Sequence, residues 1–166
     1  MNAPLDIHSA ENLLYREALH LDRCEWDEWL ALYIQNAIFW APAWRDEVNQ
    51  TNDPDSELSF IYYNGRRGLE ERVWRIRSGQ SVASKPLTRA VHSVSNVLLI
   101  RSDGSTADVT ASFVVHIFDV RAERTHAFFG RYEYGLLYDE EVWKISVKKI
   151  FLLNDVIPSV VDFYML

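Results

Sequence analysis

The fold is decided by the segment LDRCEWDEWLALY (residues 21–33) and the segment AIFWAPAW (residues 37–44) that follows it. Four of the six tryptophans of the chain lie in these two stretches. The first predicts a short helix over Glu25–Tyr33, and the second is rich in the aromatic and β-branched residues that favour a strand. Because an aromatic helix end that runs into an aromatic strand has to be buried, we expect both to pack against a larger element.

That element is predicted to be a sheet, since the hydrophobic pattern changes to a period of two from about Leu87 onward. Every odd residue from Ala107 to Ile117 is apolar and most even ones are polar, as expected for a strand with one buried face. The turn Ser102–Ser105 precedes it. The other predicted strands are Ala37–Pro42, Ser59–Tyr63, Val91–Ile100, Thr125–Tyr138 and Val142–Leu153.

Helices are predicted mainly at the N-terminal end. Ser9 is expected to cap a helix that runs to about Arg23, and Leu69–Ile76 supports a further one. We expect residues 1–8 to form a flexible tail and residues 9–166 to form a single domain. Helices followed by a long meander predict an α+β domain, with the helices packed on one face of a curved antiparallel sheet.

Composition excludes several classes of function. The 166 residues carry a formal net charge of −7, which argues against nucleic-acid binding. No apolar stretch is long enough to span a membrane, and Met1–His8 lacks the features of a signal peptide. Cys24 is the single cysteine and can form no internal disulfide, so we expect a cytoplasmic protein.

The same cysteine count limits redox chemistry. A Rieske cluster needs two cysteines and two histidines, so this chain cannot hold one by itself. His92, His116 and His126 show no recognised ligand spacing such as H-E-x-x-H, and we predict neither a metal site nor a cofactor site.

His92 is the one candidate for acid–base chemistry. In the segment HSVSN (residues 92–96), His92 and Asn96 share a strand face that is otherwise apolar. A general base inside a concave sheet has this pattern, and Asp27 or Tyr33 would lie near it. The alternative is a structural histidine whose hydrogen bonds fasten the sheet to a helix or to another chain.

The aromatic excess suggests an interface, because large aromatic side chains are favoured where proteins meet. The same residues could instead fill the core of the domain. The candidates for a subunit interface are Trp26, Trp29, Trp40, Trp44, His126 and Tyr132.

Over nearly its whole length the chain resembles the small (β) subunit of aromatic-ring-hydroxylating dioxygenases, and most of all the benzoate and anthranilate branch. The segment Phe39–Trp44 is the most suggestive of that branch. The resemblance is carried, in order, by Leu21–Asp22, Trp26–Tyr33, Phe39–Trp40, Pro42–Trp44, Ile61–Tyr63, His92–Val97, Gly130–Tyr132, Lys148–Ile150 and Leu153–Asp155.

This resemblance implies a cone-shaped fold similar to nuclear transport factor 2. It also implies a large α subunit that carries a Rieske [2Fe–2S] cluster and a mononuclear iron, and an assembly of three α and three β subunits with a trimeric β base. A reductase would supply electrons from NADH for the dioxygenation of benzoate, anthranilate, a halobenzoate or salicylate. No catalytic residue is implied for the β subunit.

A second hypothesis belongs to another class of function. Free-standing isomerases and dehydratases share the same fold, and fold alone does not separate them from a structural subunit. In that case His92 and Asp27 would be the catalytic residues of this chain.

Overall fold

Helix α1 (Ile7–Asp22) begins earlier than the sequence predicts. The computed structural model describes residues 4–158 and 160–166, and in it Asp6 is the N-cap, with its carboxylate accepting the Ser9 N–H at 2.9 Å. Ser9 is therefore not the cap. Leu5 is buried and its N–H donates to the Ser102 hydroxyl at 2.8 Å, so the part of the expected tail that is described is tied to the domain. Residues 1–3 lie outside the described residues.

The two predicted helices beyond α1 are present. Helix α2 (Trp26–Ala31) leads directly into strand β1 (Tyr33–Pro42), as the opening segment predicts. Strand β2 (Ser59–Asn64) precedes helix α3 (Arg66–Ser78), which is longer than its predicted core of Leu69–Ile76. Gly79 ends α3 with φ at +68°, a left-handed conformation that favours glycine.

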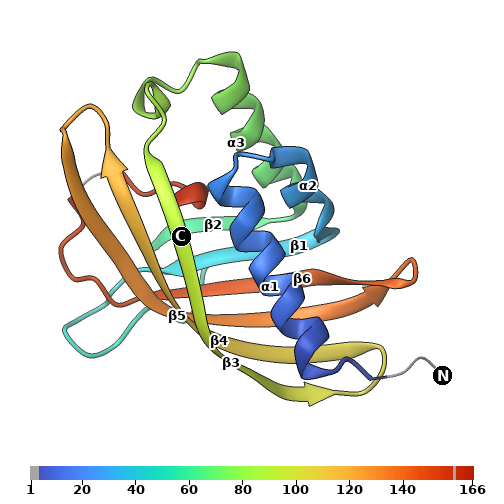
Figure 1. The fold of residues 1–166 in the computed structure, drawn as a ribbon. Coiled ribbons are helices and arrows are strands. Elements are labelled where there is room, and N and C mark those ends of the chain that lie inside the picture. Colours follow the sequence, from blue (N-terminus) through green and yellow to red (C-terminus); the bar gives the residue numbers. More distant parts are fainter. Residues whose placement is uncertain (1–3, 159) are drawn as a thin grey trace.

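Four long strands complete the sheet: β3 (Arg89–Ser102), β4 (Thr106–Asp119), β5 (Arg124–Asp139) and β6 (Val142–Leu152). The sheet order is β2-β1-β6-β5-β4-β3 (Figure 1). The curved antiparallel sheet expected from the sequence is confirmed, with one parallel pairing that was not expected, that of β1 with β6. After β1 and β2 the chain forms β3, β4 and β5 on the other side of the sheet, and β6 then lies beside β1 and runs in the same direction. A pairing between strands so far apart in sequence leaves no local signal.

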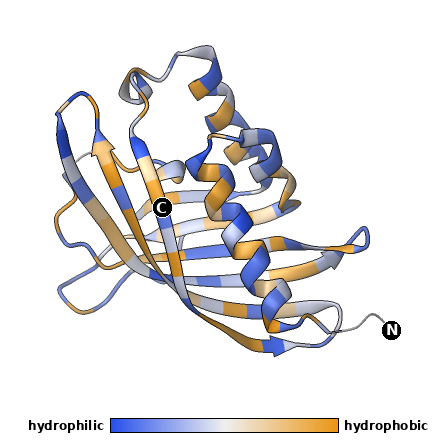
Figure 2. Ribbon diagram, viewed as in Figure 1, coloured by the Kyte–Doolittle hydropathy of each residue, from blue (hydrophilic) through white to orange (hydrophobic). Residues whose placement is uncertain are grey.

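The sheet is strongly curved and open, and the helices cover its inner face (Figure 1). Hydrophobic and hydrophilic residues alternate along the strands (Figure 2), and the buried ones form one core with the apolar sides of α1 and α3. The chain also contains two short 3₁₀ elements: η1 (Val82–Ser84) lies between α3 and β3, and η2 (Phe163–Met165) lies at the C-terminus. All three residues of η2 are buried.

No helix among the described residues is long and apolar enough to cross a membrane.

Candidate functional site

His92 is paired with the last residue of α1. Its Nδ1 lies 2.6 Å from Asp22 Oδ1, and its backbone N–H donates to the same carboxylate at 3.0 Å. Because a carboxylate only accepts, Nδ1 carries the proton. The His92 side chain is 1% exposed. Asp22 thus joins the C-terminal end of α1 to the edge strand β3, which is the arrangement that the structural interpretation of His92 predicts.

Asp27 does not take part in this pair. Its side chain is 72% exposed and forms a two-pronged ion pair with Arg77 of α3, with both N–O distances at 2.9 Å. The proposed combination of His92 and Asp27 as catalytic residues is therefore not assembled, because Asp27 faces solvent from the first turn of α2. The structure replaces Asp27 with Asp22 as the partner of His92.

A buried ionic cluster lies at the centre of the curved sheet. Glu17 of α1 accepts from Lys148 Nζ at 2.9 Å, from the Tyr134 hydroxyl at 2.6 Å and from the Tyr33 hydroxyl. Glu17 and Lys148 are only 2% and 1% exposed. The Lys148 ammonium also lies 4.4 Å from the centroid of the Tyr132 ring. Both charges are thus paired and surrounded by hydrogen-bonding and aromatic groups.

The electrostatics of this cluster follow from burial and pairing. Burial alone would raise the pKa of Glu17, but Lys148 and the hydrogen bonds from Tyr134 and Tyr33 outweigh it and hold the pKa below its ordinary value. Burial lowers the pKa of Lys148, and Glu17 opposes this shift only in part. Burial, then the nearby Glu17 charge, raises the pKa of Tyr33 and of Tyr134 well above the usual range. At neutral pH the tyrosines are therefore hydrogen-bond donors.

The sequence analysis assigned no role to Glu17, and it used Lys148 only as part of the family resemblance. Glu17 lies on the apolar side of α1, between Leu14, Ala18 and Leu21. An acid in an apolar stripe is the one local signal in the sequence that indicates a buried charge here. Lys148 begins a Lys-Lys pair in β6, where the period of two puts only one of the two lysines inside. Nothing in the sequence shows that these two residues meet.

Most of the predicted interface residues belong to the core of this chain. Trp26, Trp29 and Tyr132 are 6%, 0% and 1% exposed. Trp29 stacks on Phe163 at 4.7 Å, and Trp26 meets the same ring edge-on at 5.5 Å. Because their own chain covers them, we withdraw these three from the interface hypothesis.

The remaining three candidates lie elsewhere. Trp40 is 5% exposed but points to the opposite face of the sheet from Phe39, with its indole N–H donating to the Ser59 hydroxyl at 2.8 Å. Trp44 follows β1 and pairs with Gln50 through a short bridge. His126, near the start of β5, is partly buried, and burial lowers its pKa.

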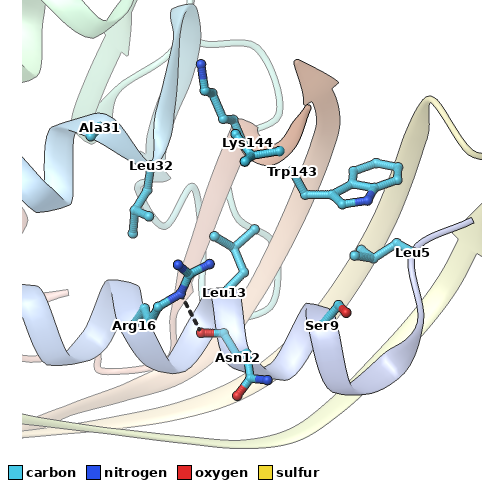
Figure 3. Close-up of a pocket in the computed structure, with 10 residues that line it drawn as sticks. Leu5, Ser9, Asn12, Leu13, Arg16, Ala31, Leu32, Trp143 and Lys144 are labelled. Atoms are coloured by element: carbon cyan, nitrogen blue, oxygen red, sulfur yellow. Dashed lines mark hydrogen bonds between the residues drawn. The ribbon is translucent and has the colours of Figure 1, made fainter. Parts of the chain in front are cut away.

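A hollow of about 560 Å³ lies at the edge of the core, between α1 and the hairpin that joins β5 to β6 (Figure 3). Leu13, Leu32 and Trp143 form apolar walls, and Arg16 and Lys144 extend at its rim. Arg16 Nε donates to the Asn12 carbonyl at 3.4 Å, while Lys144 is held by Asp139 at 2.9 Å. These contacts bring no acid–base pair to a common point among the described residues that line the hollow.

Within the described residues, no group of three or more His, Cys, Asp or Glu side chains is arranged to hold a metal ion.

Comparison with known proteins identifies the class of the chain. Residues 16–159 match the family model "Ring hydroxylating beta subunit". The benzoate 1,2-dioxygenase β subunit of Acinetobacter baylyi is 38% identical over 96% of this chain and 94% of its own length. The anthranilate 1,2-dioxygenase small subunit of the same organism is 35% identical over 96% of this chain and 98% of its own.

A solved structure agrees with these sequence matches. The β subunit of the benzoate 1,2-dioxygenase from Burkholderia mallei superposes with a TM-score of 0.82 at 32% identity, over 100% of both chains. The curved sheet with its inner helices is thus the fold similar to nuclear transport factor 2 that the resemblance implies. The chain belongs to the ring-hydroxylating β-subunit family.

Proposed function

We propose that this chain is the small, non-catalytic subunit of a ring-hydroxylating dioxygenase that acts on benzoate or a related aromatic acid. The observation that carries the proposal is the 38% identity to a benzoate 1,2-dioxygenase β subunit over 96% of the chain. The geometry is in accord with it, because His92 is tied to Asp22 in a helix–sheet contact and Asp27 is tied to Arg77 at the surface. The interpretation as a free-standing isomerase or dehydratase loses the residue pair on which it rested.

The oxidation chemistry then belongs to a large α subunit. That subunit would carry the Rieske [2Fe–2S] cluster and the mononuclear iron, and a separate reductase would deliver electrons from NADH. One cysteine in 166 residues supports this division, since a Rieske cluster takes two cysteines and two histidines. We propose the hexamer of three α and three β subunits implied by the resemblance, located in the cytoplasm.

Within this complex the chain would act as a rigid support. The Glu17–Lys148 cluster and the stacked Trp29 and Phe163 fill the interior of the curved sheet with the chain's own side chains. A filled interior leaves the outer surfaces of the domain to interact with the partner subunits. The substrate would be selected chiefly by the α subunit.

Reconstitution tests this proposal. The α subunit and a reductase are assayed with NADH, dioxygen and each of benzoate, anthranilate, a halobenzoate and salicylate, with and without this chain. We expect product only when both subunits are present, with benzoate the best substrate. An α subunit that assembles fully and turns over equally well without this chain would contradict the proposal. Product from this chain without the α subunit would contradict it too.

A further inference from the structure

The outer face of the sheet, opposite the helices, carries aromatic and cationic side chains that pack against one another. Tyr62 contacts Trp40 at 6.3 Å, Lys149 lies over Trp40 at 4.7 Å, and Arg131 lies over Phe151 at 4.6 Å. These five residues, here called the cationic patch, come from four neighbouring strands, β2, β1, β6 and β5. Aromatic and arginine side chains are the residue types that dominate binding energy at interfaces.

Lys149 is the cation of the patch that has no carboxylate within 4.0 Å among the described residues, whereas Arg131 lies 3.8 Å from Glu133. A hollow of about 480 Å³ lies beside Lys149 on the same face. Ile100, which is 64% exposed, and Val147 contribute apolar lining. Asp108 and Glu133 also line this hollow, but they pair with Arg101 and Arg131. Lys149, opposite Glu133 in the register of β5 and β6, therefore offers a positive charge without an ion-pair partner in the described chain, at the edge of a largely apolar hollow.

The complementary chemistry is present on the same molecule. The loop between β1 and β2, residues 43–58, contains five acids and one arginine. Arg45 and Glu57 pair with each other, and the Asp46 carboxylate accepts the Val48 N–H at 2.8 Å. Glu47 has no ion-pair partner within the described part of the chain, and its neighbour Val48 is 80% exposed. An exposed valine beside a free acid matches the hollow beside Lys149.

We propose that the β1–β2 loop of one copy of this chain docks on the cationic patch of a second copy, with Glu47 paired to Lys149 and Val48 in the hollow. The contact joins two different surfaces, so it is a head-to-tail contact that forms a ring when the rotation closes. A ring of three copies is the trimeric base that the proposed function requires, and this inference rests on that assembly.

Charge reversal tests the contact on the full chain without the α subunit. At micromolar concentration the wild-type chain should sediment as a trimer. Lys149→Glu and Glu47→Lys should each raise the concentration needed for assembly at least tenfold, and the double variant should restore the trimer. Val48→Asp should also dissociate it. Arg75→Glu on α3, which makes the same change of charge on the helix side, should leave the trimer intact.

Mixing the two single variants adds a test of geometry. In a closed ring of three, at least one contact must join two copies of the same variant, and there two like charges meet. The mixture should therefore form open complexes and little closed trimer. A monomeric wild-type chain would overturn the inference. The inference would also be overturned if each single variant kept the wild-type circular dichroism spectrum and still formed the trimer. A double variant that fails to reassemble would overturn it too.

The α subunit gives an independent readout. If Lys149→Glu leaves the trimer intact but abolishes co-purification with the α subunit, the patch belongs to that partner and our inference is wrong while the proposed function stands. Failure of the wild-type chain to support hydroxylation would instead count against the proposed function, whatever the state of the trimer.

Discussion

Glu17 and Lys148 are the pair of residues whose separation should be most damaging. Glu17→Gln leaves the Lys148 ammonium buried without a counter-ion, and removal of one partner of a buried pair costs about 3–5 kcal/mol of unfolding free energy. Urea denaturation followed by tryptophan fluorescence measures the change.

The matched control replaces both charges. Glu17→Leu with Lys148→Met removes the need to desolvate either charge, so we expect the double variant to recover most of the stability lost by Glu17→Gln. A double variant as unstable as the single one would mean that the hydrogen bonds of Tyr33 and Tyr134, and not the ion pair, determine the stability of the cluster.

Glu17 also predicts how stability depends on pH. Its pKa is lowered in the folded chain, so its contribution is fully present above the unfolded-state pKa of about 4.3 and is lost as the pH falls through the folded value. Between pH 5 and pH 3 the wild-type chain should therefore lose more stability than Glu17→Gln. Denaturation midpoints measured across this interval give the comparison, and parallel curves would contradict it.

His92 separates the structural from the catalytic hypothesis. His92→Ala removes the side-chain bond to Asp22, and we expect a cost of about 1–3 kcal/mol in folding or assembly. Turnover per assembled complex should change little, as measured by NADH consumption and product chromatography. A variant that folds and assembles normally while turnover collapses would mean that His92 is a general base.

At the scale of elements, the C-terminal 3₁₀ turn η2 completes the core of a chain whose sheet is open. Phe163 is 0% exposed and packs between Trp26 and Trp29. We predict that Phe163→Ala destabilises the fold by about 3–5 kcal/mol, because it leaves a cavity among large rings. Thermal unfolding should show the loss, while Val160→Ala, at a 67% exposed position nearby, serves as the control and should have little effect.

At the scale of the whole molecule, we predict that the isolated chain binds no stoichiometric iron. The reasons are a single cysteine and histidines without ligand spacing. Metal analysis of the untagged protein measures it. One iron per chain, retained after treatment with a chelator, would contradict the prediction.

Local patterns were sufficient for the elements of this protein and for its family. The period of two in Ala107–Ile117 and the helical spacing in α1 depend on neighbours a few residues apart, so they can be read without the fold. The aromatic segments at residues 21–33 and 37–44, together with the later motifs in their order, carried the resemblance to the β-subunit family. That resemblance also needs no knowledge of the fold. The helix start was missed by three residues, because Asp6 and Ser9 are both good caps.

Only the tertiary structure decided which residues meet. Glu17 and Lys148 are 131 positions apart and Asp22 and His92 are 70 apart, and their pairing depends on how α1 crosses the curved sheet. Packing against Phe163 at the other end of the chain buried Trp26 and Trp29, while alternation within β1 and β6 placed Trp40 and Lys149 on the outer face. A residue's type is a local property, whereas its partner is set by long-range packing, which no short stretch of sequence contains.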